Sequence, residues 1–412
     1  MIYTIYAPQS IQGKVSLPSS KSISNRILLL NALSACPREM ANLSESDDTQ
    51  ILKAALNSKD KLRDVGAAGT SMRFLTAYLA QCPGEYILTG SERMKNRPIG
   101  ILVEALKDAG AEIHYLGKDG YPPLQINGRK LKGGEIRLQS NVSSQYISAL
   151  MMVAPCMENG LSIRLEGEVI SEPYIRMTES LMNLFGVKII RDDNILRIAP
   201  QSYLPLPSVV ESDWSAASYM YEIVALAERT TSLSLNNLSE DSLQGDSKVR
   251  LLFESLGVCS LFGSGGVELT RSDSNDSRFV YDFINEPDLA QTFIVSCCLL
   301  DIPFRFSGLQ SLRIKETDRI EAMRAEMKKL GYLLNLEPGD ILSWNRERCS
   351  EDPEAVILTY QDHRMAMAFA PAALKRGSVR IADPEVVSKS YPGFWNDLKV
   401  MGFEIVADDS PN

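Results

Sequence analysis

The stretch Leu181-Met182-Asn183-Leu184-Phe185-Gly186-Val187-Lys188-Ile189 shows how this chain is built. A run with helical spacing of apolar residues ends at a glycine, and an apolar, β-branched run follows it. Glycine adopts the left-handed backbone that closes a helix, so the stretch predicts a helix, its C-terminal cap and a strand. The same pattern recurs at residues 103–110, 251–257, 323–331 and 398–402.

These five segments form one of two ladders with a common period. The glycines stand at 110, 186, 257, 331 and 402, which gives spacings of 76, 71, 74 and 71. Apolar helices are predicted to begin near Gly69, Ser144, Ser215, Asp288 and His363, at spacings of 75, 71, 73 and 75. An earlier member begins near Ser24 and is followed by a surface helix around 48–56, so the sequence predicts six α/β copies, the first one short.

The alternative is that unrelated α/β units fall at this spacing by coincidence, but two ladders with the same period favour a repeat. Six copies divide naturally into three and three, with a boundary near residue 212. The preceding stretch, Tyr203-Leu204-Pro205-Leu206-Pro207, has the proline content of a linker. A length of 412 residues also predicts two domains, with three as the alternative.

Composition narrows the class of protein. The net charge of −9 argues against a broad nucleic-acid surface, although a local cluster of cations could still bind an anion. The longest apolar stretch, near 293–300, is far too short to span a membrane, and the first residues lack the features of a signal peptide. We therefore expect a cytoplasmic enzyme or binding protein without a membrane segment.

Cysteine and histidine usage argues against a metal site. The seven cysteines are odd in number and form no CxxC pair, which predicts reduced thiols. The two histidines, His114 and His363, are far apart in the sequence. A zinc site built from these residue types is therefore not expected.

Four arginines occupy an unusual place, in or near the first turn of a predicted helix: Arg26, Arg73, Arg319 and Arg364. The helix dipole disfavours a cation there by about 0.3–1 kcal/mol. An anion shared between the guanidinium and the free backbone N–H groups would reverse that cost. The alternative is an ion pair with a carboxylate, which for Arg73 is the preferred interpretation, with Asp213 or Asp362 as partner.

Nine sequence blocks, in order along nearly the whole chain, resemble the signatures of 5-enolpyruvylshikimate-3-phosphate synthases. They are Pro18-Ser19-Ser20-Lys21-Ser22-Ile23-Ser24-Asn25-Arg26, Ala68-Gly69-Thr70-Ser71-Met72-Arg73, Arg93-Met94-Lys95-Asn96-Arg97-Pro98, Ser143-Ser144-Gln145-Tyr146, Ser171-Glu172-Pro173-Tyr174, Pro287-Asp288, Lys315-Glu316-Thr317-Asp318-Arg319, Asp362-His363-Arg364-Met365-Ala366-Met367 and Lys389-Ser390-Tyr391-Pro392. Each block is short, and their specificity comes from all nine occurring in register.

The resemblance implies the two-domain enolpyruvyl transferase fold, an inside-out α/β barrel of six βαβαββ units, three per domain. The amino-terminal domain would comprise residues 18–211. Residues 1–17 and 212–412 would form the carboxy-terminal domain, with the active site in the cleft between the two domains.

The resemblance also implies two sets of ligand-binding residues. Shikimate 3-phosphate would be held by Lys21, Ser22, Arg26, Thr70, Ser143, Ser144, Ser171, Asp288 and Lys315. Phosphoenolpyruvate would be held by Lys21, Gly69, Arg97, Gln145, Arg319, Arg364 and Lys389. Hydroxyl groups suit a polyol phosphate, and planar guanidinium groups match carboxylate and phosphate.

The implied reaction adds the shikimate 5-hydroxyl to C2 of phosphoenolpyruvate and then eliminates phosphate from a tetrahedral ketal. It needs acid/base groups and electrostatic stabilisation, but no metal, no organic cofactor and no covalent nucleophile. We expect Asp288 to act as the base at the 5-hydroxyl, and Glu316 as acid and base at C3 with assistance from Lys21. The alternatives are that Glu316 only pairs with Lys315 or Arg319, and that Asp288 only caps the helix 289–300.

Two other functions stay open at this stage. One is an enolpyruvyl transferase for a nucleotide sugar, although that related family usually carries a loop cysteine before the position of Arg97, and residues 89–96 contain none. The other is a non-catalytic anion-binding homologue, against which the retained charged residues argue. A monomer is expected because one chain supplies every implied ligand, and Gly69 matches the glycine of glyphosate-sensitive members.

Overall fold

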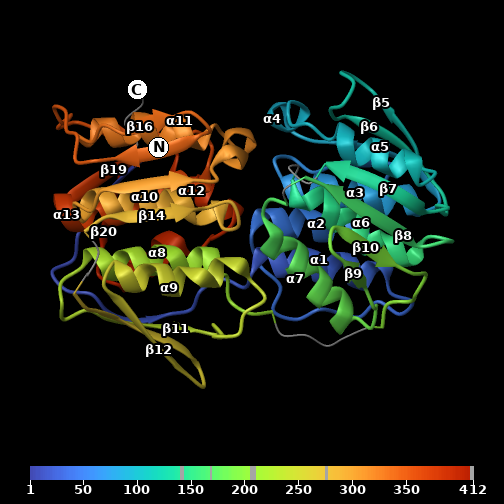
Figure 1. Ribbon diagram of the computed structural model, residues 1–412. Coiled ribbons are helices and arrows are strands. Elements are labelled where there is room, and N and C mark those ends of the chain that lie inside the picture. The colour runs from blue at the N-terminus through green and yellow to red at the C-terminus, as the bar shows by residue number, and fades with distance from the viewer. Residues whose placement is uncertain (140–142, 168, 205–209, 274–276, 409–412) are drawn as a thin grey trace. The chain divides into compact units, whose positions relative to one another are not determined.

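The computed structural model describes residues 1–139, 143–167, 169–204, 210–273 and 277–408. The chain forms two compact units (Figure 1). The amino-terminal unit is Ser19–Val210, and the carboxy-terminal unit combines Met1–Pro18 with Glu211–Asn412. The predicted linker at 203–207 lies outside the described residues from position 205 onward.

In the described part of the chain, five four-stranded sheets share one pairing pattern, which is the structural form of the sequence repeat. In each sheet the first two strands in the spatial order are parallel, and the second, third and fourth pair antiparallel. The two sheets of the amino-terminal unit are ordered β3 (Leu62–Asp64), β4 (Gly84–Thr89), β6 (Leu124–Gly128), β5 (Glu112–Tyr115) and β7 (Gly134–Gln139), β8 (Leu161–Glu166), β10 (Ile195–Ile198), β9 (Ile190–Asp192).

The first strands of the chain complete sheets of the carboxy-terminal unit. Strand β1 (Ile2–Tyr6) pairs antiparallel with β19 and β20, and β2 (Gln12–Val15) pairs parallel with β11. The three sheets are ordered β2, β11 (Ser232–Asn236), β13 (Gly266–Arg271), β12 (Val258–Gly263); β14 (Phe279–Asp282), β15 (Phe304–Ser307), β17 (Ile341–Trp344), β16 (Asn335–Glu337); and β18 (Val356–Ile357), β19 (Ser378–Ala382), β1, β20 (Glu404–Asp408).

Helices of the amino-terminal unit separate into buried and surface members. The buried α1, α3 and α6 all contact one another, and α7 packs on α1 and α6. Between residues 19 and 61 the described chain forms the helices α1 and α2 without an extended strand, which matches the short first copy. The helices are α1 (Lys21–Leu33), α2 (Asp47–Asn57), α3 (Gly69–Gln81), α4 (Glu92–Lys95), α5 (Gly100–Asp108), α6 (Ser144–Val153), the 3₁₀ helix η1 (Ala154–Cys156) and α7 (Glu172–Leu184).

The carboxy-terminal unit repeats this arrangement, with α10 packed against both α8 and α12. Its α-helices are α8 (Trp214–Leu226), α9 (Val249–Ser255), α10 (Ala290–Leu299), α11 (Arg319–Lys329), α12 (His363–Phe369), α13 (Ala373–Arg376) and α14 (Phe394–Val400). Its 3₁₀ helices are η2 (Gly245–Lys248), η3 (Pro287–Leu289), η4 (Gln310–Ile314), η5 (Ala370–Ala372) and η6 (Pro384–Lys389).

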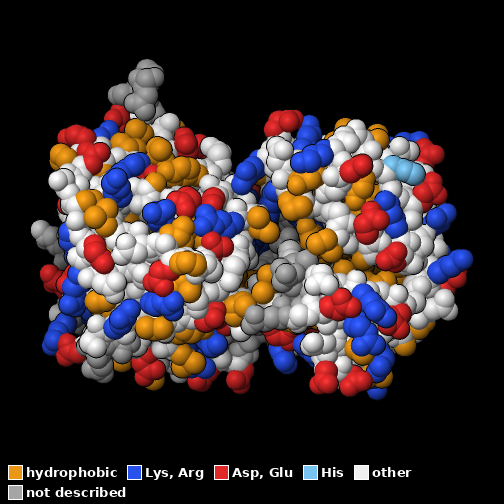
Figure 2. Space-filling view, turned by 45° about the horizontal axis from the view of Figure 1, so that its top comes forward, with side chains coloured by type: hydrophobic (Ala, Val, Ile, Leu, Met, Phe, Trp, Pro, Cys, Tyr) orange, Lys and Arg blue, Asp and Glu red, His pale blue; other side chains and the backbone are white. Residues whose placement is uncertain are grey.

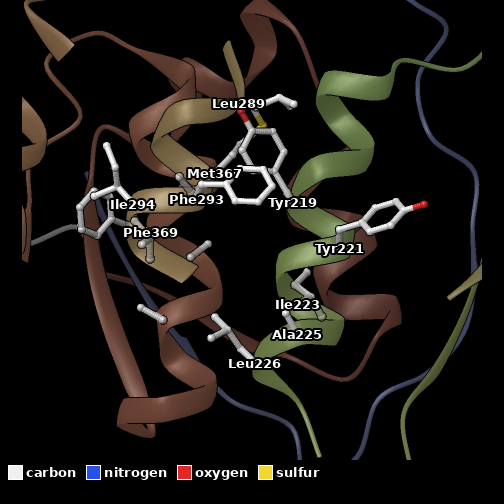
Figure 3. Close-up of a cluster of buried hydrophobic side chains, with 14 of the residues drawn as sticks. Tyr219, Tyr221, Ile223, Ala225, Leu226, Leu289, Phe293, Ile294, Met367 and Phe369 are labelled. Atoms are coloured by element: carbon white, nitrogen blue, oxygen red, sulfur yellow. The ribbon is translucent and has the colours of Figure 1, made fainter. Parts of the chain in front are cut away.

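Apolar side chains on these central helices form the core of the unit. Figure 3 shows Tyr219 of α8, Phe293 of α10 and Met367 of α12 turned toward one another, and all three are buried. Helices that are apolar all round are stable only when other elements cover every face. The apolar core of the unit therefore holds the first turns of α8 and α12 in place. This fixes the positions of the polar side chains on those turns.

The capping glycines confirm the first ladder. Gly110, Gly186, Gly257, Gly331 and Gly402 have φ values of 102°, 83°, 83°, 90° and 95°, in the left-handed region that glycine tolerates best. The predicted helix starts at Gly69, Ser144 and His363 are confirmed at the residue, and α8 begins one residue before Ser215.

Three details of the prediction were wrong. Helix α1 begins at Lys21 rather than near Ser24, because the Ser20 side chain accepts a hydrogen bond from Ile23 N. The segment 187–189 forms no strand, since the side chain of Gln201 binds both backbone groups of Lys188. Residues 332–334 also precede their strand, β16, which begins at Asn335.

Neither the charge distribution on the surface nor the helix lengths are unusual for a globular protein. On the face shown in Figure 2, cationic and anionic side chains are intermixed over both units. Among the described residues, no helix combines the length and the apolar character needed to cross a membrane.

Candidate functional site

Arg319 is the centre of a charged cluster in the carboxy-terminal unit. It opens α11, whose cap residue Asp318 accepts a hydrogen bond from Glu321 N, and its side chain is almost fully buried. Its Nε donates to Asp362 Oδ2 at 2.6 Å. Its two Nη atoms donate to Asp288 Oδ1 at 3.0 Å and to Glu316 Oε2 at 2.9 Å. One guanidinium therefore holds three carboxylates in fixed directions.

Arg364 lies in the first turn of α12 and holds Asp288 from a second direction. Its Nη2 donates to Asp288 Oδ2 at 2.9 Å, and its Nη1 donates to the Asp288 carbonyl at 3.2 Å and the Tyr219 hydroxyl at 3.3 Å. The Asp362 side chain caps α12 by accepting from Arg364 N at 2.9 Å. Asp362 thus links the two arginines and orients the helix that carries one of them.

Two lysines complete the cluster. Lys389, at the end of η6, donates to Glu316 Oε1 at 2.8 Å. Lys315 lies 3.5 Å from Asp288 Oδ1, and burial lowers the pKa of its ammonium group. The structure therefore brings together Glu316, expected as acid and base, and five residues that the resemblance assigned to substrate binding: Asp288, Lys315, Arg319, Arg364 and Lys389.

The cluster keeps Asp288 ionised. Burial would raise the pKa of its carboxyl group, but the surrounding cations outweigh that effect and hold the pKa well below its usual value. These cations are Arg364, Lys315 and Arg319. An ionised carboxylate is in the protonation state that is needed to accept a proton.

The structure argues against the helix-cap alternative for Asp288 and supports the ion-pair alternative for Glu316 in part. The cap residues of η3 and α10 are Glu286 and Leu289, and neither helix has a side-chain cap, so Asp288 does not act as one. Glu316 does pair with Arg319, as its alternative proposed, but it also accepts from Lys389.

Arg26 of α1 is the corresponding buried cation of the amino-terminal unit, and its partners are neutral. Its Nε donates to Thr178 Oγ1 at 2.7 Å, and its Nη2 donates to Ser148 Oγ at 3.2 Å and the Tyr174 carbonyl at 3.3 Å. Its Nη1 donates to the Ser22 carbonyl, four residues earlier, at 3.0 Å. Burial lowers the pKa of this guanidinium to about 10. Thr178 and Ser148 were not singled out from the sequence, because hydroxyl residues inside helices carry no distinctive pattern.

Two aromatic rings flank the same guanidinium. The Arg26 Cζ atom lies 5.6 Å from the centroid of Phe74 and 6.0 Å from that of Tyr174. Such contacts stabilise a cation in an apolar setting by roughly 0.5–2 kcal/mol. They compensate in part for the missing carboxylate.

Lys21 and Arg73 also differ in their partners. Lys21 begins α1 and forms an ion pair with Asp48 of α2 at 3.6 Å. Arg73, in the second turn of α3, donates to the carbonyl groups of Gly69 at 3.1 Å and Pro98 at 3.0 Å. Its predicted carboxylate partners belong to the other unit, where Asp213 caps α8 and Asp362 binds Arg319.

The starts of α3 and α6 meet through predicted site residues. Gln145 Nε2 donates to Thr70 Oγ1 at 3.1 Å, and the Ser143 side chain caps α6 by accepting from Gln145 N at 3.3 Å. Ser144 is buried at the first position of the same helix. Hydroxyl and amide groups therefore gather at two helix N-termini, where backbone N–H groups favour an anion.

Gly69 lies directly against the Arg97 guanidinium. A Cβ atom built on Gly69 would lie 2.6 Å from Arg97 Nη1, so the end of the Arg97 side chain would have to shift to admit a larger residue. The Arg97 Nε is buried and has no hydrogen-bond partner among the described residues. A guanidinium with an unused donor is suited to an incoming carboxylate or phosphate.

Ser171 precedes α7 with a left-handed backbone, at φ 55° and ψ 38°. This conformation costs a non-glycine residue of order 1–3 kcal/mol, and such strain is often found at ligand-binding positions. The next residue, Glu172, pairs with Arg176 at 3.1 Å and with Arg191 at 2.6 Å. Its charge is therefore neutralised locally.

Comparisons with known proteins identify the family. A family model described as EPSP synthase (3-phosphoshikimate 1-carboxyvinyltransferase) matches residues 5–58 and 52–398. A 3-phosphoshikimate 1-carboxyvinyltransferase of Bacteroides fragilis (strain YCH46) is 52% identical over 406 residues, covering 98% of this chain and 99% of its own length. The protein of that name from Vibrio atlanticus is 37% identical over 427 residues, covering 97% and 99%.

A solved structure supports the fold independently. The EPSP synthase of Acinetobacter baumannii, at 2.37 Å, matches with a TM-score of 0.77 and 20% identity, over 99% of this chain and 100% of that one. Its likeness supports the predicted two-domain enolpyruvyl transferase fold. Among the described residues, no three His, Cys, Asp or Glu side chains are grouped to hold a metal ion. The chain belongs to the EPSP synthase (3-phosphoshikimate 1-carboxyvinyltransferase) family.

Proposed function

We propose that this chain transfers the enolpyruvyl group of phosphoenolpyruvate to the 5-hydroxyl of shikimate 3-phosphate, with release of phosphate. The product, 5-enolpyruvylshikimate 3-phosphate, leads to chorismate and the aromatic amino acids. The observation that carries the proposal is the cluster around Arg319, where carboxyl groups and cations suited to acid/base work lie within hydrogen-bond distance of one another. The names of the relatives favour this acceptor over a nucleotide sugar and favour turnover over binding alone.

Both units supply ligands for the same two substrates in this proposal. Shikimate 3-phosphate is held by Lys21, Ser22, Arg26, Thr70, Ser143, Ser144, Ser171, Asp288 and Lys315. Phosphoenolpyruvate is held by Lys21, Gly69, Arg97, Gln145, Arg319, Arg364 and Lys389. We accordingly place the domain boundaries at 18–211 and at 1–17 with 212–412, and expect a cytoplasmic monomer that is a target of glyphosate.

Asp288 is the proposed base at the 5-hydroxyl. It is ionised, and its two oxygens are bound by Arg319 and Arg364. Anionic substrates would draw these guanidinium groups toward themselves and make the carboxylate more basic, because an opposite charge nearby lowers a carboxyl pKa and its withdrawal raises it. Substrate binding and activation of the base would then be one event.

Glu316 is the proposed acid that protonates C3 and the base that later removes a proton from it. Its oxygens accept from Lys389 at 2.8 Å and Arg319 at 2.9 Å, so a proton can move between carboxylate and ammonium without a large displacement. Lys21 assists from the amino-terminal unit. The cations also stabilise the charge that develops on the departing phosphate.

The test is phosphate release from the purified protein, given phosphoenolpyruvate with and without shikimate 3-phosphate. We expect release only when both are present, and a loss of about 10²–10⁴-fold in kcat in the Glu316→Gln variant, the usual contribution of a general acid or base. Glu321→Gln is the matched control, since Glu321 is exposed and its ion pairs among the described residues are with Arg313 and Arg324, two partly exposed arginines. Release with a nucleotide sugar instead, or binding without turnover, would contradict the proposal.

A further inference from the structure

The loop 315–317, which carries two of the proposed site residues, is closed at both ends by one arginine that the proposed mechanism does not use. The loop consists of bends between η4 and α11, and Glu316 stands at its centre. Arg313 of η4 precedes the loop, and its Nη1 donates to Oδ2 of Asp318 at 2.8 Å. Asp318 is the cap residue of α11, which follows the loop. The side chains of Arg313 and Asp318 therefore bridge the two ends of the loop.

The two oxygens of the Asp318 carboxylate have different partners. Oδ1 caps α11 by accepting from Glu321 N at 3.2 Å, and Oδ2 accepts from Arg313. The start of α11 and the end of η4 are thus linked through one side chain. Arg319, which binds the Glu316 carboxylate, is the first residue of α11 and follows Asp318 directly. The bridge therefore restrains the backbone on both sides of Glu316.

A second contact anchors Arg313 to a sheet. Its Nε and Nη2 both donate to Asp340 Oδ1, at 3.0 Å and 2.8 Å. Asp340 lies in the turn between β16 and β17 with a left-handed backbone, at φ 56°, and β17 pairs with β15 on one side and β16 on the other. A longer bond from Arg313 Nη1 reaches Glu321 Oε1 at 3.3 Å. A planar guanidinium suits this place, because its N–H groups point in fixed directions.

The bridge matters most once the substrates bind. Glu316 is held by Arg319 and Lys389, and both of these cations are proposed ligands of phosphoenolpyruvate. When their N–H groups turn to the substrate, the position of Glu316 depends on the backbone of the loop. Arg313 is 30% exposed, and exposed ion pairs add little to stability. The bridge is therefore better suited to keeping the loop in one conformation than to stabilising the fold.

We propose that Arg313 is a positioning residue for the proposed transferase reaction: it holds the loop 315–317 in the conformation that presents Glu316 to the bound substrates. Arg313 acts through Glu316 and contacts no reacting atom. The inference rests on the proposed function, but the restraint on the loop can be measured without turnover.

The first test is Arg313→Met, assayed by phosphate release from phosphoenolpyruvate and shikimate 3-phosphate. We expect kcat to fall about 10–100-fold and the KM for phosphoenolpyruvate to change less than about threefold, because a misplaced acid/base group slows the chemical step. An unchanged kcat would overturn the inference. Arg313→Lys keeps the charge, but one ammonium group cannot bind Asp318 and Asp340 in the fixed directions of a guanidinium, so its kcat should also fall. Full activity in this variant would show that charge alone is needed, and it would also overturn the inference.

Two comparisons separate positioning from a general loss of charge. Arg324→Met is the matched control, since Arg324 is also partly exposed and also pairs with Glu321, and its kcat should stay unchanged. The double variant of Arg313→Met with Glu316→Gln should lose little more activity than Glu316→Gln alone, because the bridge acts through Glu316. An additive loss would contradict this role.

A second variant keeps the inference testable if Arg313→Met does not fold. Asp340→Asn weakens the anchor of the bridge from its other side, because it removes the charge that accepts from two N–H groups of Arg313. Its kcat should therefore fall in the same direction, with the KM for phosphoenolpyruvate nearly unchanged. A normal kcat in Asp340→Asn would then refute the proposal.

Hydrogen exchange gives a readout that does not depend on turnover. The amide hydrogens of residues 314–322 should exchange faster in Arg313→Met than in the wild type, measured without substrates, while those of α10 should keep their rates. An unchanged exchange rate in residues 314–322 overturns the inference and leaves the proposed function standing. Faster exchange in the variant together with no phosphate release from the wild type supports the restraint on the loop and removes the proposed function.

Discussion

The buried arginines of the two units are satisfied in opposite ways. Arg319 of the carboxy-terminal unit binds three carboxylates, and its neighbours raise the pKa of its guanidinium group. Arg26 of the amino-terminal unit donates to hydroxyl and carbonyl oxygens, and burial lowers the pKa of its guanidinium group. Both side chains are almost fully buried, at 1% and 3% exposure, so the difference lies in charge compensation and not in access to water.

Under the proposed function, this difference predicts different roles for the two arginines in binding anionic substrates. A cation already paired with carboxylates contributes mainly to stability and to the arrangement of acid/base groups. A buried cation with neutral partners can attract an anionic ligand strongly, because none of those partners already neutralises its charge. The amino-terminal unit would then supply much of the anion affinity, and the carboxy-terminal unit would supply the chemistry.

The largest effect is expected when Arg319 is removed. In Arg319→Met, the carboxylates of Asp288, Glu316 and Asp362 stay buried without their shared cation. Breaking a buried ion pair by removing one partner costs about 3–5 kcal/mol, so the free energy of unfolding in urea, measured without substrates, should fall by that amount.

Arg313 offers a matched control for this variant. It also binds three carboxylates, on Asp318, Glu321 and Asp340, but its side chain is 30% exposed. Arg313→Met should cost no more than about 1 kcal/mol, because water screens exposed ion pairs. Equal losses in the two variants would contradict the view that burial makes the Arg319 cluster costly to break.

The sequence predicts more of the fold than of the contacts in the candidate site. The repeat, its capping glycines and most helix starts follow from local pattern, because each depends on residues adjacent in the chain. The same holds for the unusual position of Arg319 and Arg364 in first helical turns. Their partners could not be predicted from pattern alone, since Asp288 and Arg319 stand on different helices of one copy of the repeat, Arg364 belongs to the next copy, and the three meet only through packing.

Asp246 shows the limit most clearly. It lies in the short 3₁₀ helix η2, carries no periodic signal and belongs to none of the blocks that indicated the family. It is set apart by its burial, at 4% exposure, and by the absence of a hydrogen-bond partner for one oxygen among the described residues. Desolvation depends on every surrounding atom, so a residue of this kind is found from the structure and not from spacing.

The second prediction removes the cation with neutral partners. In Arg26→Met, Ser148 and Thr178 can still bind each other at 2.8 Å, and Thr178 can still donate to the Tyr174 carbonyl at 2.8 Å. The loss of unfolding free energy should therefore stay near 1–2 kcal/mol. The dissociation constant for shikimate 3-phosphate, measured by calorimetry, should instead rise about 100-fold, the value of a charged hydrogen bond to an anion.

Arg63 provides the control for Arg26. It is also buried in the amino-terminal unit and donates to carbonyl groups, those of Ser58 and Leu62, but it is outside the proposed site. Arg63→Met should lower stability by a similar amount and leave the affinity for shikimate 3-phosphate unchanged. If both variants lost affinity equally, Arg26 would be a structural residue and the contrast between the units would not hold.

The smallest effect is expected at Gly69, where a methyl group would displace Arg97 without removing any charge. The added Cβ of Gly69→Ala would lie 2.6 Å from Arg97 Nη1, so the guanidinium must move by several tenths of an ångström or more. Arg97 is proposed to bind phosphoenolpyruvate, so the KM for phosphoenolpyruvate should rise about tenfold, which corresponds to about 1.4 kcal/mol. The dissociation constant of shikimate 3-phosphate should change little. The double variant with Arg97→Ala separates the two contributions, because a loss that remains once the guanidinium is absent comes from the proposed contact of Gly69 itself with phosphoenolpyruvate. A fully additive loss would contradict the prediction that the methyl group acts through Arg97.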